Sequence, residues 1–151
     1  MGCTKTIFSG STRDVLIGRI ETLDAFSQPQ WGKMTVYQML KHCTLWDEWV
    51  LGKRQYKGRV FIGRLVGPMA LRQLVKDDRP LSKNTPTFKP LEVRETGDVM
   101  RQKAEWIVQL AEYEEYDTEV FMHVFFGKMT KEQVGCLAYK HADHHLRQFG
   151  G

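Results

Sequence analysis

The motif Gly-Lys-Met-Thr-x-x-Gln occurs twice in this chain, at residues 32–38 and 127–133. A threonine followed three residues later by glutamine is typical of a helix start. The hydroxyl accepts a hydrogen bond from the third helical residue, and the glutamine reaches back to the cap. The motif therefore predicts that Thr35 and Thr130 are N-caps. The methionine before each cap is placed for a hydrophobic staple.

Apolar residues recur with helical spacing along most of the chain. Gly52 stops the helix that follows Thr35, and Pro68 predicts a kink or a later start in its own segment. Helices are expected over residues 12–26, 35–51, 60–76, 98–116 and 130–149. The apolar stripe predicted for the first of these is Leu16, Ile20, Leu23 and Phe26. In the fourth, one face carries Met100, Ala104, Ile107 and Ala111, and beside it lie Trp106, Leu110 and Tyr113.

Residues 77–97 are rich in proline and show little periodicity, which indicates a long loop. We expect this loop to cover one end of the molecule and to form a pocket wall, with Phe88 and Leu91 buried. Residues 118–126 are apolar but too short and aperiodic to assign. With no predicted strand pair, the expected fold is all-α. It is a single domain over residues 1–151, a four-helix bundle with one short extra helix and a long loop.

The chain has 151 residues, of which 42% are hydrophobic and 26% charged, so a globular domain is expected. It has no apolar run of about 18 residues and no apolar signal-peptide core, so neither membrane contact nor secretion is expected. The net charge of +4 is small, and the basic run at residues 53–59 is interpreted as a solvated loop, so no nucleic-acid binding is expected. Cys3, Cys43 and Cys136 are far apart and form no CxxC pair, which favours a reduced, cytoplasmic protein.

Two histidines occupy similar positions on the two capped helices. His42 lies seven residues after Thr35, and His141 lies eleven residues after Thr130. At about 100° per residue, they turn to about −20° and +20° relative to their caps. The two side chains are therefore expected on similar faces of their helices.

The core-facing stripe of the last helix changes from apolar residues to histidines. Val134 and Leu137 continue at the same spacing into His141 and His145. Two histidines four residues apart on a helix can bind one metal ion, and His42 is the natural third ligand. Three neutral imidazoles suit Zn(II), Ni(II) or Fe(II) and leave one coordination position open, as in catalytic sites.

His144 is an alternative partner for His141, since a spacing of three residues also brings two imidazoles to one face of a helix. The residues alone do not choose between His144 and His145. Ala142 stands where the zinc-protease motif H-E-x-x-H has its glutamate, so a protease of that class is not expected.

The two helix-start motifs, His42 and the run H-A-D-H-H-L-R-Q at residues 141–148 together resemble the DinB-like superfamily. Within it, the chain is similar to the bacterial branch catalogued as domain of unknown function 1569, from about residue 7 to residue 150. The resemblance implies a four-helix bundle in which His42, His141 and His145 hold a divalent metal ion.

Arginine and glutamine often follow the last metal ligand in this family, which favours His145 over His144. Many members of the branch have His-Pro before Phe-Phe-Gly, whereas this chain has His123-Val124, so the role of His123 stays open. The role of His144 also stays open, with a place beside the ligands or at the surface as the options.

Characterised relatives of the superfamily include transferases and an isomerase that use low-molecular-weight thiols. The resemblance therefore implies a metal-dependent enzyme that activates a small thiol and acts on a small-molecule substrate. The alternatives are a metal-dependent hydrolase and a metal- or small-molecule-binding domain without turnover. A homodimer is an option that the sequence leaves open.

Four further residues near these histidines are not expected to bind the metal ion. Cys43 lies on an apolar stripe and is expected in the core. Asp47 and Glu48 are expected either in solvent or as hydrogen-bond partners that orient a ligand imidazole. Asp143 is expected to face solvent.

Overall fold

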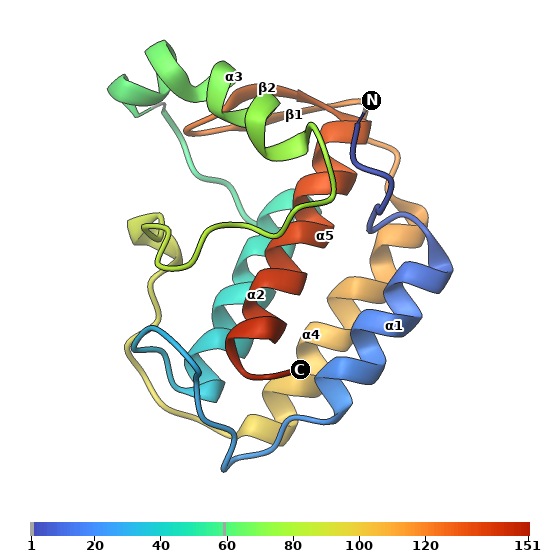
Figure 1. Cartoon of the computed structure of the whole chain (residues 1–151), viewed down its shortest axis with the longest axis vertical. Helices are drawn as coiled ribbons and strands as arrows, with labels where there is room; N and C mark the ends of the chain where they lie inside the picture. Colours follow the sequence, from blue (N-terminus) through green and yellow to red (C-terminus); the bar gives the residue numbers. More distant parts are fainter. Residues whose placement is uncertain (1, 59) are drawn as a thin grey trace.

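The computed structural model describes residues 2–58 and 60–151 (Figure 1). Its elements, in chain order, are α1 (Gly10–Glu21), α2 (Val36–Val50), α3 (Phe61–Val75), the 3-10 turn η1 (Lys89–Leu91), α4 (Val99–Glu112), the 3-10 turn η2 (Tyr113–Glu115), β1 (Val120–His123), β2 (Gly127–Thr130) and α5 (Lys131–Gln148). Each predicted helix is present, and the described residues are mostly helical with a small two-stranded sheet. None of the described helices combines the length and the apolar character that crossing a membrane requires.

Both predicted capping boxes are present. Thr35 Oγ1 accepts from the Gln38 backbone N–H at 3.2 Å, and Gln38 Oε1 accepts from the Thr35 N–H at 3.0 Å. The same pair of hydrogen bonds joins Thr130 and Gln133, at 3.4 and 2.9 Å. The two helices that carry the histidines therefore begin where the sequence predicts.

Four helices, α1, α2, α4 and α5, run alongside one another (Figure 1). α2 packs against α4 and α5, and α1 packs against the same two helices. Fully buried side chains between them include Leu16, Ile20, Met39, Leu40, Trp106, Leu110, Val134 and Leu146. Burial of apolar surface stabilises such a core by roughly 25 cal/mol per Å². The contact of α2 with α5 also brings His42 to the last helix.

The expectation of an all-α fold is wrong, because an antiparallel hairpin precedes α5. β1 pairs with β2 in a register that runs from Val120 opposite Thr130 to His123 opposite Gly127. Gly127, with a φ of 79°, closes the short turn. The sequence pattern does not indicate the hairpin for two reasons. Apolar and polar residues do not alternate along β1, whose burial is also irregular, and the residues of β2 belong to the helix-start motif.

α3 covers the hairpin with a face made of glycines (Figure 1). A Cβ atom on Gly63 or Gly67 would lie 2.4 or 2.2 Å from the carbonyl oxygen of Phe125, so a larger residue at either position would clash with backbone. Leu71 continues this buried face. The outer side of α3 is consequently left with Phe61, Ile62, Leu65, Val66 and Met69.

Two of the predicted core-facing stripes are partly wrong. Phe26 is 86% exposed, because α1 ends at Glu21 before reaching it. On α4, Met100 is 62% exposed. The residues that α4 buries are Gln102, Lys103, Trp106, Gln109 and Leu110.

The buried polar side chains of α4 have hydrogen-bond partners. Lys103 Nζ donates to the carbonyl oxygen of Glu21 at 2.9 Å, at the C-terminal end of α1. Gln102 Nε2 donates to Thr44 Oγ1 at 2.9 Å. Trp106, Leu110 and Tyr113, expected beside the stripe that starts at Met100, are buried. Apolar spacing does not indicate Gln102 and Lys103, which can be buried because hydrogen bonds satisfy their polar groups.

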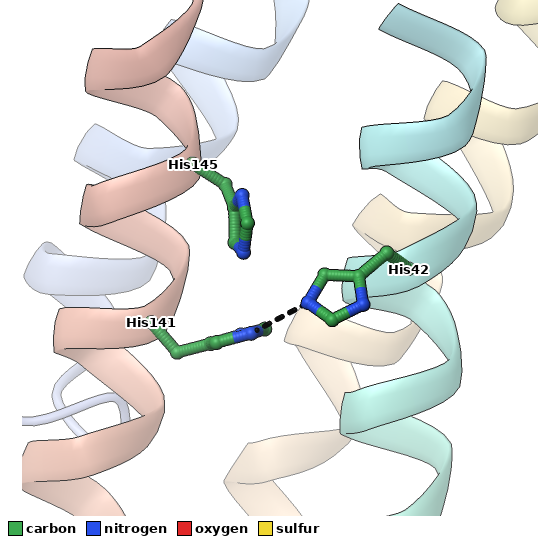
Figure 2. Close-up of side chains that lie close together, drawn as sticks. All are labelled: His42, His141 and His145. Atoms are coloured by element: carbon green, nitrogen blue, oxygen red, sulfur yellow. Dashed lines mark hydrogen bonds between the residues drawn. The ribbon is translucent and has the colours of Figure 1, made fainter. Parts of the chain in front are cut away.

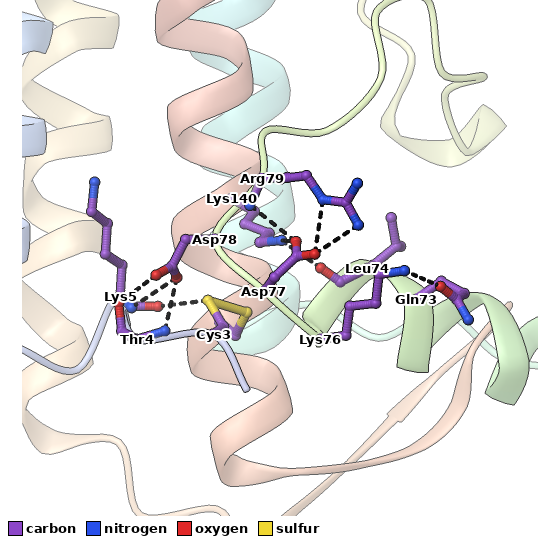
Figure 3. Close-up of polar contacts among 11 residues, drawn as sticks. Cys3, Thr4, Lys5, Gln73, Leu74, Lys76, Asp77, Asp78, Arg79 and Lys140 are labelled. Carbon is purple, nitrogen blue, oxygen red and sulfur yellow. Dashed lines mark hydrogen bonds and ion pairs between the residues drawn. A yellow bond between two sulfur atoms is a disulfide. The ribbon is translucent and has the colours of Figure 1, made fainter. Parts of the chain in front are cut away.

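A disulfide joins Cys3 to Cys136 on α5, so the prediction of a reduced chain is wrong (Figure 3). Cys43 is buried and free, in agreement with its assignment to the core. The N-terminal segment is also held by Asp78, which accepts from the Thr4 backbone N–H at 2.8 Å. These contacts attach the start of the chain to α5 and to the segment after α3.

Candidate metal centre

His42 is buried on the face of α2 that packs against α5, with 4% of its surface exposed. Its Nδ1 lies 2.9 Å from the carbonyl oxygen of Leu91, which belongs to η1 in the long loop. A carbonyl oxygen only accepts hydrogen bonds, so Nδ1 carries the proton and donates it. The Nε2 atom of His42 is therefore left with a lone pair directed at α5.

His145 is oriented in the same way by a residue of its own helix. Its Nδ1 lies 2.9 Å from Gln148 Oε1, and Gln148 Nε2 donates to the carbonyl oxygen of Trp31 at 3.0 Å. Since Oε1 is an acceptor, Nδ1 of His145 is the donor and Nε2 keeps its lone pair. A Cβ on Gly32 would lie 2.7 Å from Gln148 Nε2, so glycine at this position leaves room for the amide.

His141 completes a cluster of three imidazoles (Figure 2). Its ring stacks on Trp46, with ring centroids 4.7 Å apart and planes inclined by 23°. Its Nε2 lies 3.0 Å from Nε2 of His42. One nitrogen from each of His42, His141 and His145 lies within 4.8 Å of the others, which confirms the predicted proximity.

Burial keeps these three imidazoles neutral. Desolvation lowers the pKa of His42, and it lowers the pKa values of His141 and His145 well below their ordinary range. For His141 the neighbouring imidazoles lower the pKa further, because two positive charges would repel one another. Neutral imidazoles at pH 7 are the form in which histidine binds metal ions.

The donor set fits a divalent metal ion. Nitrogen ligands about 2.0–2.1 Å from a tetrahedral zinc ion lie roughly 3.3 Å from one another. The nitrogen atoms of His42 and His141 are 3.0 Å apart, and one nitrogen of each of the three histidines lies within 4.8 Å of the others. Small rotations of the rings would therefore bring all three nitrogen atoms to bonding distance from one ion. The hydrogen bonds to Leu91 and Gln148 are the kind that orient metal-binding imidazoles.

A cavity of about 540 Å³ opens beside the three histidines, and all three line it. Most of its other lining residues are apolar or aromatic: Trp46, Trp49, Val60, Leu74, Leu81, Phe88, Leu91, Val124, Phe125, Phe126 and Leu137. Among the described residues that line it there is no aspartate or glutamate. The cavity thus suits a small, largely apolar molecule.

The long loop supplies one wall of this cavity, as predicted. Leu91 is buried, and Phe88 is half-buried, so the expectation for Phe88 is met in part. Phe88 stacks on Trp49, with ring centroids 5.8 Å apart. The loop therefore both encloses the cavity and provides the carbonyl oxygen that orients His42.

His123, whose role the sequence left open, also lines the cavity. Its Nδ1 accepts from the backbone N–H groups of Phe125 and Phe126, both at 3.1 Å. Burial lowers the pKa of His123 to about 4, so the ring is neutral and its proton is on Nε2. His123 is thus a fixed hydrogen-bond donor in an apolar cavity rather than a member of the ligand cluster.

His144 lies between this cavity and a neighbouring groove of about 720 Å³, and it lines both. The groove is more polar than the cavity and includes Lys33, Glu92 and Arg94. The His144 ring meets Trp31 edge to face, with centroids 5.7 Å apart. His144 lies beside the cluster of three imidazoles but is not one of its members.

Asp47 and Asp143 are both buried, and neither contacts the cluster. Asp47 accepts from Trp106 Nε1 at 2.7 Å and from the Tyr113 hydroxyl at 2.6 Å. Asp143 accepts from Arg19 and Arg147, each at 2.7 Å, so its predicted exposure is wrong. Both carboxylates hold helices together instead of orienting a histidine.

The fold and the cluster define a mostly helical protein with three histidines within metal-binding distance. The chain belongs to the family described as Protein of unknown function (DUF1569), which it matches over residues 11–150. No curated protein and no solved structure matches it.

Proposed function

We propose that this protein is an enzyme that binds a divalent metal ion through His42, His141 and His145 and acts on a small molecule held in the adjoining cavity. The observation that carries the proposal is the convergence of three neutral imidazoles at the wall of a largely apolar cavity. The side-by-side arrangement of α1, α2, α4 and α5 supports the further proposal that the fold is a DinB-like four-helix bundle.

A divalent metal ion held by three imidazoles has one coordination position left open. A thiol or a water molecule bound at that position would have a lowered pKa. The chain itself contributes orientation and binding. Leu91 and Gln148 fix the His42 and His145 rings, and aromatic side chains make the cavity wall largely apolar. His123 offers a hydrogen bond from Nε2 to a polar atom of a substrate in the cavity.

Activation of a low-molecular-weight thiol is the reaction type that the cavity supports best. Many metal-dependent hydrolases use a carboxylate to take a proton from the attacking water, and no carboxylate among the described residues lines the cavity. A small thiol has a pKa of about 8.5 in water, far below that of water itself, so near a divalent cation it would release its proton to solvent more readily than water does. We therefore propose a thiol-dependent transferase that acts on a small molecule.

Metal analysis of protein purified without a histidine tag tests the metal site. We expect His42→Ala, His141→Ala and His145→Ala each to abolish stoichiometric binding of Zn(II), Ni(II) or Fe(II). His144→Ala is the matched control, because His144 lies beside the cluster and is expected to leave most of the binding intact. Equal losses from His144→Ala and His145→Ala would contradict the ligand assignment.

The Co(II)-substituted protein tests the chemistry. Addition of 2-mercaptoethanol should produce a thiolate-to-cobalt charge-transfer band in the wild type and in Cys43→Ser, but not in His42→Ala. If the Co(II) spectrum does not change on addition of the thiol and the protein hydrolyses a test ester or amide, the alternative function of a metal-dependent hydrolase is supported. Metal binding without a response in either assay would support a binding domain without turnover.

A further inference from the structure

The outer side of α3 presents a row of exposed apolar side chains, here called the α3 outer face. Its members are Phe61, Ile62, Leu65, Val66 and Met69. Phe61 is 75% exposed, Leu65 69% and Met69 67%. A contiguous apolar surface of this kind on a folded domain usually marks an interaction site.

The orientation of α3 is fixed by its opposite side. Gly63 and Gly67 lie against the backbone of Phe125, where even a methyl group would clash. Turning the helix to bury Leu65 or Met69 would replace this close glycine contact with bulky side chains. The apolar residues therefore face outward as a consequence of the packing of α3 on the hairpin.

The same part of the chain is basic. Residues 49–76 contain seven Lys or Arg residues and no Asp or Glu. Lys53 and Arg54 are neutralised by Glu112 and Glu48. Arg64 and Arg72 are exposed on α3, and neither has an ion-pair partner among the described residues.

We propose that the α3 outer face binds the surface of a membrane that contains anionic lipids. An interfacial helix combines exposed large apolar residues, which enter the acyl-chain boundary, with Arg or Lys residues that pair with anionic headgroups. α3 has both kinds of residue and no acidic residue within its 15 residues. It lies on the bilayer and does not cross it, which agrees with the absence of a membrane-spanning helix among the described residues.

Charge complementarity separates this partner from a second copy of the chain. A two-fold symmetric contact through the α3 outer face would set two copies of α3, each with Arg64 and Arg72 and no acidic residue, against one another, and like charges repel. An anionic bilayer instead attracts both arginines while it accepts the apolar side chains. The sequence-based expectation of no membrane contact rested on the lack of a spanning segment, which an interfacial helix does not need.

Vesicle flotation with the full-length protein tests the proposal. The probes are vesicles of phosphatidylcholine with phosphatidylglycerol and vesicles of phosphatidylcholine alone. We expect the wild type to float with the anionic vesicles, to bind the neutral ones roughly tenfold less, and to be released by salt. Circular dichroism on every variant verifies that the protein is folded.

Two variants test the apolar and the basic components separately. Leu65→Ser combined with Met69→Ser should reduce binding roughly tenfold or more, because less apolar surface enters the bilayer. Phe26→Ser is the matched control, since Phe26 is even more exposed, at 86%, but lies after α1. Arg64→Gln with Arg72→Gln should remove the preference for anionic vesicles, whereas Arg94→Gln with Arg101→Gln should leave it unchanged.

Three results would overturn the proposal. The first is that no vesicle binding is detected. The second is that binding is lost equally in Phe26→Ser. The third is a stable dimer in analytical ultracentrifugation that Leu65→Ser with Met69→Ser dissociates, which would assign the surface to a second copy of the chain. Because every readout is vesicle binding or mass, the test is independent of metal binding and of any catalytic activity.

Discussion

Nε2 of His42 lies 3.0 Å from Nε2 of His141, a separation at which one of the two nitrogen atoms must carry a proton unless a metal ion lies between them. The proton on His42 is on Nδ1, where it is donated to Leu91. In the metal-free protein, His141 is therefore the donor from Nε2. If His141 binds a metal ion through Nε2, as proposed, that atom must offer its lone pair and the proton of His141 must move to Nδ1.

This change of tautomer is the first prediction. Imidazole nitrogen–proton correlation spectra should show His141 protonated at Nε2 in the metal-free protein and at Nδ1 after addition of Zn(II). His123 is the internal control, because its Nδ1 accepts two backbone hydrogen bonds and should stay unprotonated throughout. If His141 keeps one tautomer with and without the metal ion, it is not a ligand through Nε2.

The second prediction concerns Gly32, which leaves room for the amide that orients His145. Gly32→Ala should displace Gln148 and weaken metal binding about tenfold, a typical effect of disturbing a residue that orients a ligand. Gly52→Ala is a matched control, since Gly52 has nearly the same positive φ but nothing within 4 Å of an added Cβ. Both variants should lose roughly 1 kcal/mol of stability from backbone strain. Calorimetric titration with Zn(II) should show the affinity loss only in Gly32→Ala.

The third prediction concerns Asp47, whose pKa burial raises to about 7 despite hydrogen bonds from Tyr113 and Trp106. Because the folded protein binds this proton more tightly than the unfolded chain, the contribution of Asp47 to stability is complete below about pH 4 and is lost as pH rises to about 7. The loss is on the order of 4 kcal/mol for a shift of this size.

Comparison of the wild type with Asp47→Asn isolates this contribution. The histidines change stability in the opposite direction, since their lowered pKa values favour the folded state above about pH 6.5. The relevant quantity is therefore the difference between the two unfolding free energies, measured with urea from pH 4 to pH 8. A difference that does not vary with pH would mean that Asp47 is ionised in the folded protein throughout this range.

The fourth prediction concerns the close contact of α3 with the hairpin. Gly63→Ala and Gly67→Ala should each destabilise the protein by roughly 1–3 kcal/mol, the range expected for overpacking against backbone. Gly18→Ala in α1 should instead stabilise by about 0.5–1 kcal/mol, because nothing lies near its added Cβ and alanine favours the helix. Equal, small effects at all three positions in thermal unfolding would contradict the packing of α3.

The fifth prediction concerns the Cys3–Cys136 disulfide. Reduction, or Cys3→Ser, should lower the free energy of unfolding by roughly 2–5 kcal/mol, because the link constrains the unfolded chain over a long loop. Alkylation of the denatured, non-reduced protein should label Cys43 and neither of the other cysteines. Labelling of Cys3 in fully oxidised protein would show that the disulfide does not form.

The local features of the sequence predicted the helix starts and the histidine cluster well. Capping depends on side chains a few residues apart, so the sequence identifies Thr35 and Thr130, and counting turns from them places His42 and His141 on similar faces of their helices. The partners that tune the site could not be predicted in this way. The Leu91 carbonyl oxygen contacts His42 from a loop that is distant in sequence. Every residue has such an oxygen, so residue type does not indicate which one will be the partner.

Long-range pairing accounts for the other failures. Cys3 and Cys136 are 133 residues apart, and no spacing rule links them. Asp143 has the sequence context of an exposed residue, but Arg19 from α1 and Arg147 satisfy its charge in a buried position. In both cases the partner is brought close only by tertiary packing, which the periodicity of a single segment does not report.

The loop that encloses the cavity has a consequence for how the protein works. Residues 85–88 lie at the cavity wall, and Leu91, only a few residues further on, holds the ring of His42. A displacement of this loop would loosen the orientation of His42 at the same time. If His42 binds a metal ion as proposed, access to the cavity and retention of that ion are coupled, so a bound substrate that keeps the loop closed should slow the loss of the metal to a chelator.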